Sequence, residues 1–233
     1  FTPDGTRIIF LSNRNGCCDL FMMNVDGTDQ INLTNHAEVY SNDRFQCTPD
    51  GSKVVYSRIM SVTESHEIWS VDLNDYSHTQ LSSDRCEDSS ISPDGTKIVF
   101  KSIGAIYESN IDIYLMDIDG NNVVNLTQDD SHNTYPQFSP DGTKILYNSW
   151  YWNTNIRDLY IIDLDGSNKT KLTNHDVVGV EVNHPVFSPD GTKILFDIME
   201  NDDSEIAIME VDGSNKTNLT NNQFFDRIPQ FQP

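Results

Sequence analysis

The sequence predicts an all-β protein, a β-propeller of five four-stranded blades whose ring is closed by the C-terminal segment. One observation is a repeated ten-residue sequence: FSPDGTKILY at 138–147 returns as FSPDGTKILF at 187–196 and as ISPDGTKIVF at 91–100. A second is its spacing, because the motif prolines fall 44 to 49 residues apart, at Pro3, Pro49, Pro93, Pro140 and Pro189. A period of this length accommodates four short strands, the unit of a propeller blade.

The strands of one unit follow in order in the fourth repeat. Residues 135–138 form a first strand, the turn SPDGT follows, and the apolar, β-branched run that begins at Lys144 forms a second strand. After a variable loop, DLYIIDLDG at 158–166 predicts a third strand that ends in an Asp-Gly turn, and SNKTKLT at 167–173 the fourth. No segment keeps a helical apolar period without interruption by Gly, Pro or Asn.

The two ends of the chain interrupt the same motif. The chain opens at Phe1-Thr2-Pro3, and it ends with IPQFQP at 228–233. We therefore expect one propeller domain over 1–233, with repeats starting near the motif prolines and residues 225–233 supplying the innermost strand of the first blade. This arrangement removes an exposed sheet edge. A fragment of a six-, seven- or eight-bladed ring is the alternative.

The composition is strongly acidic, with 36 Asp and Glu against 15 Lys and Arg and a formal net charge of −21. A surface of this charge repels phosphate backbones, which excludes nucleic acid as a partner and favours cations and basic partners. No apolar run reaches the length of a membrane helix, so no transmembrane segment is expected. The chain begins at Phe1 rather than Met, which fits a mature product, a trimmed chain or a fragment, and is compatible with a removed export signal.

The four cysteines do not form a CxxC pattern, which argues against a structural zinc site. Cys47 takes the place of Phe138 and Phe187 in the repeat, so we expect it to be a small core residue. Cys17, Cys18 and Cys86 fall in predicted loops, where a disulfide between Cys86 and one of the pair is one alternative and free thiols are the other.

The repeat resembles the TolB-like family of WD40-like Pro-Asp-Gly propellers. The resemblance rests on Phe138 to Lys144 and its counterparts, and on the Leu-Thr pairs at 33–34, 126–127, 172–173 and 219–220. It covers essentially the whole chain, and blade two departs most, with Leu-Ser-Ser at 81–83. It implies a periplasmic, cell-surface or extracellular protein that binds other proteins without catalysis. The alternative that it implies is a polysaccharide-active enzyme or the non-catalytic propeller of a peptidase or lyase.

The tight turns are near-identical in every repeat, so we expect the sequence-variable loops at the other ends of the strands to carry the function. The loop SWYWNTNIR at 149–157 is the most distinctive, because large aromatic side chains are costly to expose. We expect aromatic residues on this face to bind a protein or glycan, with local core packing as the alternative. They are Trp150, Tyr151, Trp152, Tyr40 and Tyr107.

A second candidate is a polar collar at the channel mouth, six residues before each motif proline. Its members are Asp43, Glu87, Thr134, Asn183 and Arg227. Asp43 and Glu87 could help to hold calcium or another divalent cation, which takes oxygen ligands. Simple salt bridges are the favoured explanation because Arg227 is part of the set, and the sequence firmly implies no cofactor.

Catalytic motifs were not found: the sequence has no GxSxG, no HExxH and no phosphate loop. His132, His175 and His184 could converge on the channel mouth, where lyase-type members of the family use a histidine cluster with a metal, but no further ligand pattern accompanies them. The Asn-x-Thr sites recur because the blade recurs, so they are weak indications of glycosylation.

Overall fold

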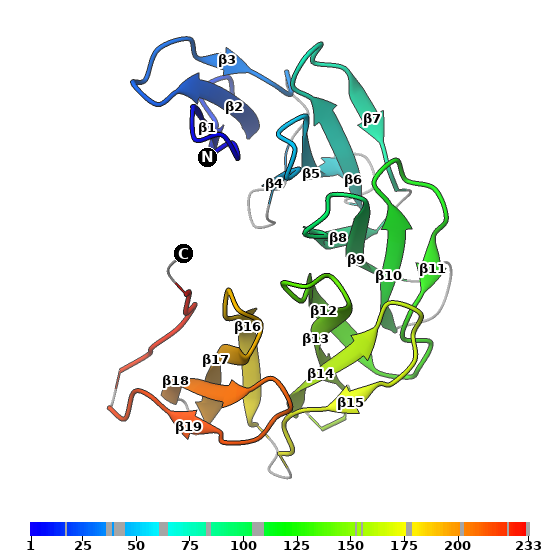
Figure 1. The fold of residues 1–233 in the computed structure, drawn as a ribbon, viewed down its shortest axis with the longest axis vertical. Helices are drawn as coiled ribbons and strands as arrows, with labels where there is room; N and C mark the ends of the chain where they lie inside the picture. The colour runs from blue at the N-terminus through cyan, green and yellow to red at the C-terminus, as the bar shows by residue number, and fades with distance from the viewer. Residues whose placement is uncertain are drawn as a thin grey trace. The chain divides into compact units, whose positions relative to one another are not determined.

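The computed structural model (Figure 1) describes most of the chain, and its Cα positions divide into two compact units. The first unit comprises Phe1–Ser102 and Met116–Val123, and the second comprises Ile103–Leu115 and Val124–Pro233. Every regular element among the described residues is a β-strand, and no helix in them is long and apolar enough to cross a membrane. The described residues are 1–16, 18–35, 39, 45–60, 65–82, 85–103, 110–151, 153–154, 156–175, 179–200, 203–222 and 224–231.

The strands are short and follow one another in the predicted order. The first nine are β1 (Arg7–Ser12), β2 (Asp19–Asn24), β3 (Ile31–Asn32), β4 (Gln46–Cys47), β5 (Lys53–Met60), β6 (Ser65–Asp72), β7 (His78–Gln80), β8 (Cys86–Ile91) and β9 (Lys97–Ile103). The other ten are β10 (Ile111–Asp117), β11 (Val124–Asn125), β12 (His132–Phe138), β13 (Lys144–Trp150), β14 (Arg157–Asp163), β15 (Thr170–Lys171), β16 (Glu181–Phe187), β17 (Lys193–Glu200), β18 (Asp203–Glu210) and β19 (Thr217–Asn218).

Strand pairing within each unit gives the blade predicted from the repeat. In the first unit, β4-β5-β6-β7 form a four-stranded antiparallel sheet, whereas the first repeat forms a three-stranded sheet, β1-β2-β3. In the second unit, β12 to β15 and β16 to β19 form two further antiparallel sets. A single parallel residue pair, Arg157 with Glu181, joins β14 to β16. The all-β fold and the four-stranded repeat are therefore confirmed.

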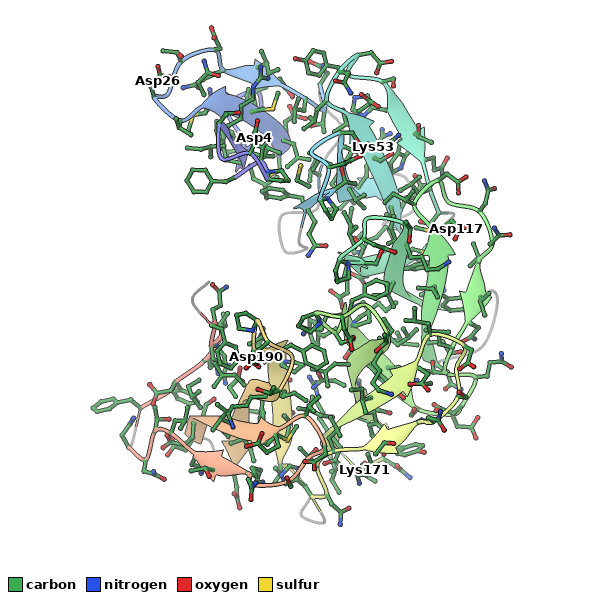
Figure 2. The ribbon with its side chains drawn as sticks, in the orientation of Figure 1. Asp4, Asp26, Lys53, Asp117, Lys171 and Asp190 are labelled. Atoms are coloured by element: carbon green, nitrogen blue, oxygen red, sulfur yellow. The ribbon has the colours of Figure 1, made fainter. Side chains whose placement is uncertain are left out.

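The Ser-Pro-Asp-Gly-Thr sequence recurs because its side chains build the turn. Ser139 Oγ donates a hydrogen bond to Asp141 Oδ1 at 2.6 Å, and the backbone N–H of Thr143 donates to the same oxygen at 3.0 Å. Lys144 N–H donates to Ser139 Oγ at 3.0 Å, and Gly142 has a φ of 71° that favours glycine. The same aspartate contacts recur at the four other turns, two of them marked by Asp4 and Asp190 in Figure 2: Asp4, Asp50, Asp94 and Asp190.

The Leu-Thr motif closes the outer hairpin of each blade by a second repeated device. Thr173 Oγ1 donates to Asp158 Oδ1 at 2.7 Å and accepts from the N–H of Leu159 at 3.0 Å. The same pair of bonds is made by Thr34 with Asp19 and Leu20, and by Thr127 with Asp112 and Ile113. In blade two, where the motif departs, Ser82 Oγ still accepts from the N–H of Ile68 at 2.8 Å.

The core lies between the strands of neighbouring repeats within each unit. One cluster surrounds Leu146, Val182 and Phe196 in the second unit, and another surrounds Leu20, Val54 and Tyr56 in the first. Of the residues predicted at the equivalent first-strand position, Phe138 is buried. The others are only partly buried, because that position lies near the end of the first strand: Cys47, Ile91, Phe187 and Phe231.

The C-terminal segment has the backbone conformation of a first strand, although residues 224–231 form no strand. Ile228 has a φ of 57°, and the residues five before the earlier motif prolines have the same left-handed conformation: Asp88 at 54°, Tyr135 at 54° and His184 at 47°. In β8, β12 and β16 this residue lies at a register shift, a β-bulge. Its pairing with β1 remains a prediction.

Candidate functional site

The variable loops leave the strands next to a row of cross-strand neighbours in the second unit. His132 on β12 lies opposite Trp150 on β13, and Trp150 lies opposite Arg157 on β14. Arg157 in turn lies beside Glu181 on β16. Four strands from two consecutive repeats therefore bring these side chains to one edge, where the loop of residues 151–156 begins and ends.

Trp150 lies between two of these neighbours. Its ring stacks on His132, with centroids 4.6 Å apart and planes 28° apart, and the Arg157 guanidinium lies 5.1 Å from its centroid. Arg157 is itself fixed, because its Nη1 donates to Asn183 Oδ1 at 3.2 Å and its Nε lies 3.7 Å from Glu181 Oε2. These contacts occupy much of the indole surface, so Trp150 supports the loop more than it offers a stacking surface.

Tyr151 is the aromatic residue that this support presents to solvent. Its side chain is 50% exposed, and its carbonyl oxygen accepts from the N–H of Thr154 at 3.1 Å, which closes a tight turn. The other three predicted partner-binding residues lie outside the described residues: Trp152, Tyr40 and Tyr107.

The described members of the predicted collar make ordinary local contacts. Glu87 accepts from His66 Nδ1 at 3.1 Å and pairs with Lys101 Nζ at 3.4 Å, as the salt-bridge alternative expects. Thr134 is buried, and Asn183 is engaged by Arg157. The Arg227 guanidinium lies 5.2 Å from the ring centroid of Phe225.

The fifth collar residue, Asp43, lies outside the described residues. Among the residues that the structure describes, no three His, Cys, Asp or Glu side chains are grouped closely enough to hold a metal ion.

The sequence analysis missed the residue one position after each collar residue. At the β-bulge, Tyr135 is 40% exposed although its neighbours in β12 are largely buried, and its ring lies 6.0 Å from that of His184. Asp197, which is 1% exposed, accepts from His184 Nδ1 at 2.7 Å and fixes the ring, which leaves Nε2 as its second polar atom. The prolines that follow both residues, Pro136 and Pro185, were the available signal.

His175 is held by a different carboxylate. Its Nδ1 lies 2.9 Å from Asp158 Oδ1, and Lys171 Nζ lies 2.8 Å from Asp158 Oδ2. Burial raises the pKa of Asp158, but hydrogen bonds from His175, Lys171 and Thr173 outweigh it and leave this pKa below its ordinary value. Burial also lowers the pKa of His132, which keeps that imidazole neutral beside Trp150. The three histidines of the predicted cluster thus have separate structural contacts.

Comparison with known proteins identifies the repeat. A family model described as the TolB beta propeller domain matches residues 1–108 and 103–233. An uncharacterized protein of Agrobacterium fabrum is 32% identical over 157 residues, which cover 63% of this chain and 52% of that protein. A TolB homolog of Chlorobium luteolum is 27% identical over 143 residues, which cover 61% of this chain and 31% of that protein. The alignments thus span about half or less of these relatives.

Solved structures share the fold. A putative TolB from Agrobacterium tumefaciens superposes with a TM-score of 0.74 at 24% identity, over 94% of this chain and 78% of that one. An oligogalacturonate lyase in complex with manganese gives the same TM-score at 15% identity, over 94% of this chain and 63% of that one. At these identities the likeness concerns the fold alone.

Proposed function

The chain belongs to the TolB β-propeller family, and from this premise we propose that it is a non-enzymatic binding propeller. It engages a protein or a glycan through its variable loop edge. The observation that carries the proposal is the arrangement of Tyr151, an exposed aromatic side chain next to a strand end that is fixed by stacking and ion pairing. Binding residues on a loop carried by a rigid scaffold are a common way to present a recognition surface.

Preorganisation is the physical reason why this edge suits binding. An exposed aromatic side chain supplies contact area while losing few rotamers, and a fixed support reduces the ordering cost of association. The His132–Trp150–Arg157 stack ties together three strands at the base of the Tyr151 loop. Trp152 follows in the same loop, and Tyr40 and Tyr107 belong to other loops of the same kind, so we assign all of them to the binding edge.

The tight-turn edge has little to offer a selective partner. Its serine, threonine and aspartate side chains bond one another within each turn, as Ser139 and Asp141 do. Its lysines pair with carboxylates on the neighbouring strand, as Lys97 Nζ does with Asp117 Oδ1 at 2.8 Å. Because the same groups recur in each repeat, they distinguish no site from another.

The proposal includes the architecture and the location. We infer a single domain of five blades over 1–233, closed when residues 225–231 pair with β1, which is the edge strand of a three-stranded sheet. The left-handed φ of Ile228, shared with Tyr135 and His184, supports this because the segment already has the first-strand conformation. The family resemblance supports a location in the cell envelope or outside the cell.

A pull-down from the native source with two matched variants tests the binding edge. Tyr151→Asn removes the exposed ring on the variable edge, and Tyr76→Asn removes a comparably exposed ring from a hairpin at the opposite edge. Tyr151→Asn should lose the partner and Tyr76→Asn should keep it. If Tyr151→Asn kept every partner that the parent captures, this edge would be the wrong one. Turnover of a captured glycan would favour the polysaccharide-active alternative.

A further inference from the structure

Neighbouring repeats contact each other through a leucine and a glycine. In the second unit, a β-carbon added at Gly213 would lie 2.6 Å from the carbonyl oxygen of Leu172, and one at Gly166 would lie 3.3 Å from that of Leu126. In the first unit, a β-carbon at Gly120 would lie 2.7 Å from the carbonyl oxygen of Leu81. Each leucine belongs to the Leu-Thr position of one repeat, and each glycine belongs to the Asp-Gly hairpin of the next.

A second contact repeats at the Pro-Asp-Gly turns. A β-carbon at Gly95 would lie 3.1 Å from Pro49 Cδ, and one at Gly51 would lie 3.7 Å from Pro3 Cδ. In the second unit, one at Gly191 would lie 3.6 Å from Pro140 Cδ. Each repeat therefore offers a leucine and a proline to the next repeat, which answers with two glycines.

The last repeat offers its half of this contact without a neighbour. Leu219 is 55% exposed, whereas Leu172, at the same position one repeat earlier, is 7% exposed. Phe224 and Phe225 follow within a few residues and are also exposed. Exposed apolar residues that lie this close in sequence indicate an interaction surface.

The first repeat offers the complementary half. Gly27, which follows Asp26 in Figure 2, has a φ of 85°, and no atom lies within 4 Å of the place that its β-carbon would take. The same holds for Gly5, whose φ is 69°. Gly120, Gly166 and Gly213 have the same hairpin conformation, with φ values of 81° to 86°, but each is covered by a leucine.

We propose that the outer face of the last blade, formed by Leu219 and Pro189, docks the first blade of this same chain through Gly27 and Gly5. This inference rests on the closed ring proposed above, and it adds a packing interface that does not involve the donated strand. Two surfaces of one chain meet at an effective concentration in the millimolar range when geometry permits, which favours the chain's own blade over a second copy at micromolar concentration.

Three matched Gly→Asn variants test the contact. Asn tolerates positive φ better than most residues, so the backbone cost is similar in all three and the neighbour of the new side chain decides the outcome. Gly213→Asn meets the Leu172 carbonyl and should lower the Tm, whereas Gly16→Asn, in a loop with open space and a φ of 97°, should change it little. Gly27→Asn should behave as Gly213→Asn does, with a Tm at least about 4 °C below that of Gly16→Asn.

The outcomes separate this inference from the proposals on which it rests. If Gly27→Asn melts with Gly16→Asn, the docking is wrong. If the parent forms dimers that Gly27→Asn abolishes, or its Tm falls on about a hundred-fold dilution, the occupant is a second copy and the assignment to the same chain is wrong. A Gly27→Asn effect that persists in a chain lacking residues 225–233 supports the docking and rejects the donated strand. Partner capture depends on Tyr151 and is unaffected by Gly27→Asn while the chain is folded.

Discussion

Replacing Thr173 by Val tests whether the Leu-Thr motif is structural. The substitution nearly preserves the shape of the side chain and removes its hydroxyl. That hydroxyl donates to Asp158 Oδ1 at 2.7 Å and accepts from the N–H of Leu159 at 3.0 Å. Asp158 and Leu159 are both buried, so water cannot easily replace either bond.

The magnitude follows from what the substitution leaves behind. A buried N–H without a partner costs about 1–3 kcal/mol, and a hydrogen bond to a charged group is worth about 1.5–3 kcal/mol. Asp158 retains His175 and Lys171 as partners, which limits the second loss. We therefore expect Thr173→Val to lower the free energy of unfolding by about 3 kcal/mol, with an unchanged denaturant m-value.

Urea unfolding followed by tryptophan fluorescence measures this change, and the same blade offers a control. Thr170 lies on β15, is exposed, and its Oγ1 donates only to the Asn168 carbonyl oxygen at 3.1 Å. Thr170→Val should change the free energy of unfolding by less than about 0.5 kcal/mol. A cost below about 1 kcal/mol for Thr173→Val, or equal costs for the two variants, would refute the structural reading of the motif.

Three further predictions concern the turns, the core and the ring. Hydrogen bonds from Ser188 and Thr192 lower the pKa of Asp190 to about 2, so its contribution is present above about pH 4 and is lost as the pH falls through about 2. Urea midpoints of Asp190→Asn should thus depend less on pH across this window than those of the parent. Leu146→Ala, in the core, should cost about 2–5 kcal/mol in urea unfolding, against less than about 0.5 for exposed Val25→Ala. Deleting residues 225–233 should lower the Tm by more than about 2 °C if this segment closes the ring, and a smaller shift would contradict closure.

The fold was predictable because its determinants are local and repeated. Each Pro-Asp-Gly turn is built by residues within five positions of one another, such as Ser139, Asp141 and Lys144, so the sequence pattern contains the whole device. The same holds for the Asp-Gly hairpins, where the glycine supplies a positive φ. Blade two could be assigned despite its departure because Ser82 keeps the hydroxyl that the motif requires.

The candidate site was less predictable because its contacts cross strands. The stacking of Trp150 on His132 depends on the pairing register of β12 and β13, which are separated by a turn. The exposure of Tyr135 depends on a bulge that shifts the register by one position, so counting residues back from the motif proline selected its buried neighbour Thr134. Three of the five predicted aromatic residues lie outside the described residues, and their roles remain predictions.

Hydrogen–deuterium exchange of the captured complex tests the central claim, that the variable loop edge meets the partner. Exchange is compared peptide by peptide between the free and the bound chain. The account predicts that backbone amides at 148–157 and 179–184 become protected on binding, while those of the tight turns at 140–143 and 189–192 do not change. Protection confined to the tight turns, with unchanged exchange around Tyr151, would contradict it.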